Sequence, residues 1–126
     1  MTTAADKWRD QLKLWAIPQE IIDQAETSPW IHPPMIFQIP ENFVMNPSHE
    51  RALEAMPEGG SVLDIGSGGG IGAFALTGKI GKAIAVDHQQ EMLDMFAASA
   101  IDKGLEHQEF LGDWPQVADQ TPIADV

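Results

Sequence analysis

The residues with the clearest chemical potential are four glycines and a serine that fill positions 66–70. A short apolar run precedes them at residues 61–65, and a helix-like stretch begins at Ile71. Glycines between a strand and a helix let the backbone turn sharply and approach a ligand closely. The N–H groups that open such a helix can donate to polar or anionic ligand atoms. The run therefore predicts a small-molecule site, with a ligand-free turn as the alternative.

Two carboxylates further along the chain each follow an apolar run, as the glycine-rich run does. Asp87 closes a second apolar run at residues 83–86, and Asp113 follows a weaker third run at residues 108–111. In α/β folds an acid at the end of the second strand accepts hydrogen bonds from ribose hydroxyls. A helix N-cap is the alternative role for Asp87, and a solvated turn is the alternative for Asp113.

The elements that position these residues alternate between strand and helix patterns. The three apolar runs predict strands, and helical spacing predicts helices after Ile71 and from Met92 to Ala100, the second capped by Gly104. Residues 123–126 are typical of a fourth strand that is just starting. This order predicts an α/β fold with a parallel sheet and right-handed crossovers, so the loop and both acids should meet at one sheet edge.

Residues 1–57 have a different character, because they are rich in Trp, Pro and Met and show no strand alternation. We predict a helix around Trp8 and Trp15, a second helix after Pro18, and a third after an Asn46 N-cap. The prolines of residues 28–40 require extended or turning chain. We expect this helical and proline-rich part to cap residues 58–126 and partly cover the ligand site, with its tryptophans packed in the core or a lid.

Composition narrows the classes of function. The 126 residues have no cysteine, so disulfides and thiolate metal sites are ruled out, and no apolar run is long enough for a transmembrane helix. A net charge of −12 disfavours nucleic acid and anionic membranes as partners. His32, His49, His88 and His107 do not fall at metal-ligand spacing, so we predict no metal site. We expect a cytoplasmic protein.

Three ordered motifs resemble those of class I S-adenosylmethionine-dependent methyltransferases. Residues 62–70 are similar to the family's glycine motif, Val86-Asp87 followed by Met92-Leu93 to its second motif, and residues 111–114 to its third. The resemblance spans residues 58–126 and implies a Rossmann-like methyltransferase sheet. It also implies S-adenosylmethionine as the cofactor and a methyltransferase activity for the full-length protein.

The resemblance implies a role for each matching residue. Gly66, Ser67, Gly68 and Gly70 would surround the methionine and ribose parts of the cofactor, and Asp64 would orient that region. Asp87 would hold the ribose, with His88 beside the adenine, while Asp113 and the backbone of Trp114 would read the adenine edge. No catalytic residue is implied, although His32 or His49 could act as a general base.

Two rival functions stay open. Residues 68–73 also satisfy the dinucleotide fingerprint, which would make the chain a nicotinamide- or flavin-binding domain. Asp64 inside the motif, the long segment before the first strand and the Gly112-Asp113-Trp114 motif favour the methyltransferase. The other rival is a non-catalytic binding or interaction module.

The family normally continues for several strands beyond the third. We therefore expect the chain to be truncated, and residues 1–126 alone to be inactive and either self-associated or marginally stable. The methyl acceptor is expected to be a small molecule, such as a sugar or another hydroxylated metabolite.

Overall fold

A computed structural model describes all 126 residues, which form two compact units, Met1–His32 and Pro33–Val126. None of its helices combines the length and apolar character that crossing a membrane requires. The sequence places a boundary at residue 57, whereas the second unit begins at Pro33 and so includes the chain that leads into the sheet.

The first unit holds two helices, α1 (Ala4–Trp15) and α2 (Gln19–Gln24). A capping box starts α1: the Thr3 hydroxyl accepts the Asp6 N–H at 3.1 Å, and the Asp6 carboxylate accepts the Thr3 N–H at 2.9 Å. Neither helix has a buried residue. Trp8 is 64% exposed and Trp15 is 84% exposed, so the core alternative for these side chains is wrong, and the lid alternative stays a prediction.

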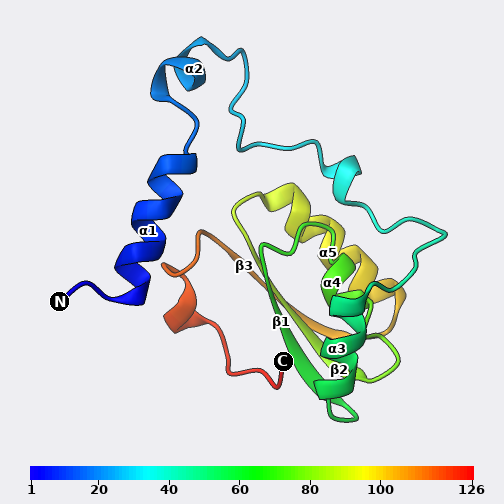
Figure 1. Cartoon of the computed structure of the whole chain (residues 1–126). Coiled ribbons are helices and arrows are strands. Elements are labelled where there is room, and N and C mark those ends of the chain that lie inside the picture. The colour runs from blue at the N-terminus through cyan, green and yellow to red at the C-terminus, as the bar shows by residue number, and fades with distance from the viewer. The chain divides into compact units, whose positions relative to one another are not determined.

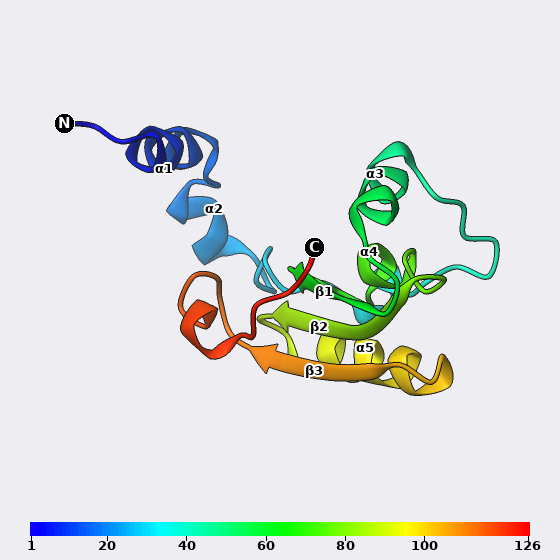
Figure 2. The same cartoon turned by 90° about the horizontal axis from the view of Figure 1, so that it is seen from below.

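The second unit is built on a three-stranded sheet, which confirms the predicted fold class. The strands are β1 (Gly60–Ile65), β2 (Ile80–Asp87) and β3 (Glu106–Leu111), in the order β1-β2-β3. Both pairings are parallel, and Figure 2 shows all three arrows pointing the same way. Because Ile65 pairs with Val86 and Asp87 pairs with Leu111, the strands end side by side.

Helices α3 (Pro47–Ala55), α4 (Ile71–Phe74) and α5 (Gln90–Asp102) accompany the sheet. Asn46 is the N-cap of α3 with Pro47 in its first turn, as predicted. One core cluster joins the sheet to these helices; its buried members include Met56, Val62, Phe74, Ala83, Ala85, Leu93 and Phe96. Two short 3₁₀ helices, η1 (Pro34–Phe37) and η2 (Ala118–Gln120), complete the fold (Figure 1).

The predicted fourth strand is not formed as a strand, yet its residues do lie against β1. The Val126 N–H donates to the Ser61 carbonyl at 3.2 Å, and the Leu63 N–H donates to the Val126 carbonyl at 2.9 Å. This exchange is the hydrogen-bonding pattern of a parallel pair. Figure 1 shows the C-terminus beside β1.

Candidate functional site

The carboxyl ends of the three strands enclose a cavity, which we call the strand-end cavity. Its volume is about 160 Å³, and it is lined by Ile65, Gly66, Val86, Asp87, His88, Gly112, Asp113 and Trp114. β1 and β2 supply their last residues and the first residue of the loop that follows each, and the loop after β3 supplies Gly112, Asp113 and Trp114. Ligands of open α/β sheets bind outside the carboxyl ends of the strands, so the cavity occupies the expected place.

The glycine loop, residues 66–70, is held by its own backbone. The N–H groups of Gly66 and Ser67 both donate to the Val86 carbonyl of β2, at 2.8 and 3.1 Å. The Gly70 N–H donates to the Ser67 carbonyl at 2.9 Å and closes the turn into α4. Gly70 has a left-handed φ of +96°, and a Cβ there would overlap the Phe74 ring, so only glycine fits.

Asp87 ties the loop to β2. Its carboxylate oxygens accept one backbone N–H each, from Gly68 at 2.9 Å and from Gln89 at 3.0 Å. The N-cap of α5 is Gln89 and not Asp87, so the N-cap alternative for Asp87 does not hold. Each carboxylate oxygen has a second lone pair, which leaves Asp87 able to accept further hydrogen bonds from a ligand in the cavity.

Asp64 lies behind the loop and not in the cavity. Its Oδ2 accepts the Ala73 N–H of α4 at 3.1 Å, and Gly72 leaves room for it, since a Cβ at Gly72 would lie 3.3 Å from that oxygen. Burial raises the pKa of Asp64, the Ala73 hydrogen bond opposes that rise, and the charge of Asp87 adds to it. His49 of α3 is close enough to lower the pKa of Asp64 slightly, as the smallest of these effects.

Asp113, His88 and Trp114 form the outer wall of the strand-end cavity. The Asp113 carboxylate and the His88 Nδ1 are 3.9 Å apart, and both side chains face solvent for about half of their surface or more. Trp114 is 42% exposed. An exposed ion pair at this distance contributes little stability.

The other side of the glycine loop is covered by η1. A Cβ added to Gly68 would lie 3.1 Å from the Phe37 Cβ, and one added to Gly69 would overlap the Phe37 carbonyl oxygen. Gly68, Gly69 and Gly70 are accordingly buried, whereas Gly66 is exposed and has open space where a Cβ would stand. Phe37, in the proline-rich part of the chain, therefore contacts the glycine loop itself.

The structure separates the nine predicted site residues into two groups. Gly66, Asp87, His88, Asp113 and Trp114 line the strand-end cavity. Asp64, Ser67, Gly68 and Gly70 lie behind its wall, where they hold the loop. Sequence reasoning did not identify Phe37, nor Gln89, whose N–H orients Asp87. The proline-rich apolar run was the only signal for Phe37, and the N-cap position was the only one for Gln89.

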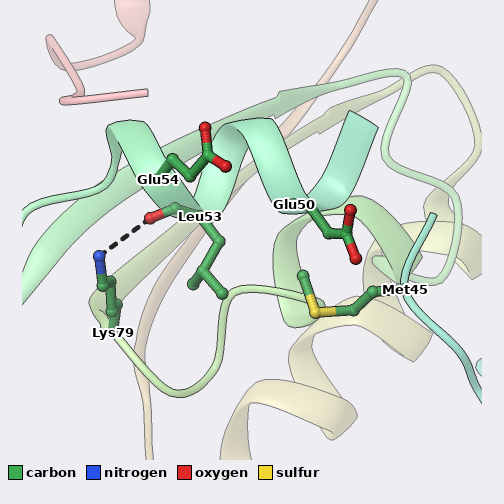
Figure 3. A pocket seen from close by; sticks show the side chains of 5 residues that line it. All are labelled: Met45, Glu50, Leu53, Glu54 and Lys79. Atoms are coloured by element: carbon green, nitrogen blue, oxygen red, sulfur yellow. Dashed lines mark hydrogen bonds between the residues drawn. The ribbon is translucent and has the colours of Figure 1, made fainter. Parts of the chain in front are cut away.

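A second cavity of about 430 Å³ lies beside α3 (Figure 3). It is lined by Met45, Glu50, Leu53, Glu54 and Lys79, and the Lys79 ammonium donates to the Leu53 carbonyl at 3.1 Å. None of the nine predicted site residues lines it. Nowhere in the structure do three or more His, Asp or Glu side chains gather as metal ligands.

Comparison with solved structures identifies the fold. The C-terminal domain of precorrin-6Y C5,15-methyltransferase from Rhodobacter capsulatus matches 74% of this chain with a TM-score of 0.55 and 20% sequence identity. A dimethyladenosine transferase from Plasmodium falciparum matches 58% of the chain with a TM-score of 0.46 and 22% identity. The chain spans 53% of the first structure and 28% of the second.

No protein-family model and no curated protein sequence matches the chain. The likeness to the Rhodobacter capsulatus domain covers most of the chain, and the structure has the parallel sheet and crossover helices that the motifs predict. The chain therefore has the Rossmann-like fold of class I S-adenosylmethionine-dependent methyltransferases.

Proposed function

We propose that this chain binds S-adenosylmethionine in the strand-end cavity and is the cofactor-binding part of a methyltransferase. The observation that supports this most strongly is the convergence of Gly66, Asp87 and Asp113 on one cavity, from the ends of three different strands. These positions match the three motifs of the resemblance in their order along the chain.

The chemistry of the cavity suits an adenosine group. Asp87 offers carboxylate oxygens to vicinal ribose hydroxyls, because each oxygen is committed to only one backbone N–H. Gly66 exposes bare backbone with no side chain between it and the cavity. Trp114 and His88 supply flat aromatic surface, and Asp113 supplies an acceptor for an amino group.

The bound cofactor would supply a methyl group on a sulfonium, which is already activated for transfer to a nucleophile. The protein would then contribute mainly proximity and alignment. In this account Asp87 fixes the ribose, Gly66 lets the ligand approach the backbone, and Asp64 keeps the loop in register with α4 through the Ala73 N–H.

We propose a small molecule as the methyl acceptor. The net charge of −12 would repel a phosphate backbone, so a hydroxylated metabolite fits this surface better than a nucleic acid does. A screen of labelled methyl transfer to neutral hydroxylated compounds and to RNA would test this choice. Transfer to RNA in preference to the small molecules would overturn it.

Calorimetric titration tests the cofactor assignment. We expect S-adenosylhomocysteine, the demethylated product, to bind with one site per chain and NAD to give no binding heat. Because both ligands contain adenosine, NAD controls for adenosine binding in general. Binding of NAD in preference to S-adenosylhomocysteine would replace the proposal with the dinucleotide function, and binding of neither would refute both.

A further inference from the structure

The contact between η1 and the glycine loop joins residues far apart in the sequence. Phe37 ends η1, and its side chain meets the space in front of Gly68, with its Cβ, Cγ and Cδ1 atoms 3.1–3.3 Å from where a Gly68 Cβ would stand. The Phe37 carbonyl oxygen fills the position where a Gly69 Cβ would stand. The absence of side chains at both glycines is what permits this approach.

Gly68 is thus held at two points. Its N–H donates to the Asp87 carboxylate at 2.9 Å, and its Cα faces the Phe37 side chain. Gly69 is enclosed between the Phe37 carbonyl and the Met95 sulfur of α5. The loop is therefore fixed to β2 by a hydrogen bond and to η1 by packing.

The segment that carries Phe37 is itself anchored. The Ile36 N–H donates to the Pro33 carbonyl at 3.1 Å and the Gln38 N–H donates to the Met35 carbonyl at 3.3 Å, which closes the 3₁₀ turn. Ile39, two residues after Phe37, packs against the core cluster. Ile36, by contrast, is 67% exposed, and its side chain is not among those that meet the glycines or the core cluster, so it provides a neighbouring control position.

We propose that Phe37 is a positioning residue for the cofactor: it holds the glycine loop in the conformation that presents Gly66 and Asp87 to the strand-end cavity. This inference rests on the proposed function for its ligand. A weakened Phe37 contact frees Gly68, and Gly68 is bonded to the same Asp87 carboxylate that faces the ligand. Loss of the Phe37 ring should therefore lower cofactor affinity although Phe37 does not line the cavity.

The test compares Phe37→Ala, Phe37→Leu and the control Ile36→Ala. Amide hydrogen exchange of residues 66–70 is measured without ligand, and S-adenosylhomocysteine affinity is measured by calorimetry. We expect Phe37→Ala to speed exchange in the loop and to weaken binding roughly tenfold, because misplacement of a supporting group is costly in a preorganised site. Phe37→Leu should recover most of both, and Ile36→Ala should match the wild type.

The two readouts separate the failure of this inference from that of the proposed function. If the wild type does not bind S-adenosylhomocysteine, the proposed function fails, while loop exchange still decides whether Phe37 holds the loop. If the wild type binds and both Phe37 variants behave like Ile36→Ala, the inference is overturned. Should Phe37→Ala fail to fold, Phe37→Val takes its place with the same expected result, faster exchange in the loop and weaker binding. A Phe37→Val variant that behaves like Ile36→Ala overturns the inference.

Discussion

Asp87 accepts hydrogen bonds from the loop backbone and, in the proposed function, from the ribose of the cofactor. Substitution of Asp87 therefore tests the proposed ribose contact. Replacing Asp87 with Ala removes the acceptor for the Gly68 and Gln89 N–H groups and the proposed acceptor for ribose. We predict that S-adenosylhomocysteine binding weakens by about 1–3 kcal/mol, the usual effect of leaving polar groups without their partner. Calorimetry gives the value. Asp102→Ala, at the exposed end of α5, is the control, and equal affinity in the two variants would refute the ribose role.

The buried carboxyl group of Asp64 should make the stability of the fold depend on pH. Burial raises the pKa of Asp64 above its ordinary value of 3.8, so the folded state favours the protonated form. The stability that protonated Asp64 contributes is present below that ordinary value and is lost as pH rises through the raised pKa. Asn cannot ionise, so Asp64→Asn lacks this loss.

Urea unfolding of both proteins from about pH 3 to 7 measures the effect, with wild type and variant compared at each pH so that other titrating groups cancel. We expect the unfolding free energy of the wild type to fall relative to that of Asp64→Asn as pH rises above 3.8. A difference independent of pH would show that Asp64 ionises without penalty.

At the scale of elements, the segment after η2 is fastened to β1 by Asp125. Its Oδ2 accepts both the Ser61 N–H at 2.9 Å and the Ser61 hydroxyl at 3.2 Å. Asp125→Ala should reduce the free energy of unfolding by about 1 kcal/mol, the net value of a typical hydrogen bond. Asp119→Ala, in exposed η2, is the matched control. Equal chemical-denaturation midpoints for the two variants would mean that this attachment adds nothing to stability.

Elements with a strong local signal could be predicted from the sequence. The Asn46-Pro47 start of α3 and Gly104, which has a φ of +66° just after α5, follow from rules that act within a few residues. The start of β2 was missed because Gly81 interrupts its apolar run, whereas the pairing of Gly60 with Ile80 extends the strand. Helix α4 is shorter than its apolar spacing suggests, because the Leu76 N–H bonds to the Ala73 carbonyl, three residues back.

In the site too, the features that follow from the strand order could be predicted, whereas a contact between distant segments could not. That Gly66, Asp87 and Asp113 meet could be predicted, because parallel strands bring their carboxyl ends to one edge. The separation of Gly66 in the cavity from buried Gly68 could not, since it depends on Phe37, some thirty positions earlier in an irregular segment. Proline-rich chain has no periodicity from which such a contact could be read.

For the molecule as a whole, the core lies in one of the two units. All members of the core cluster, and the half-buried residues packed against it, fall between Ile39 and Val126. We predict that a chain beginning at Pro33 unfolds in one cooperative transition, with a thermal midpoint close to that of the whole chain. A chain beginning at residue 46 is the control, because it also lacks Phe37 and Ile39 and should be less stable. A non-cooperative transition in the first variant would show that Met1–His32 is part of the folding unit.

NMR of the ¹⁵N-labelled chain during titration with S-adenosylhomocysteine would show whether the strand-end cavity holds the adenosine of S-adenosylmethionine. We predict that the largest amide shifts occur at Gly66, His88, Gly112, Asp113 and Trp114, from the ends of all three strands. The cavity lined by Glu50, Leu53 and Lys79 serves as an internal control and should show none (Figure 3). Shifts concentrated at that second cavity, or a saturating titration that leaves the strand ends unperturbed, would contradict this prediction.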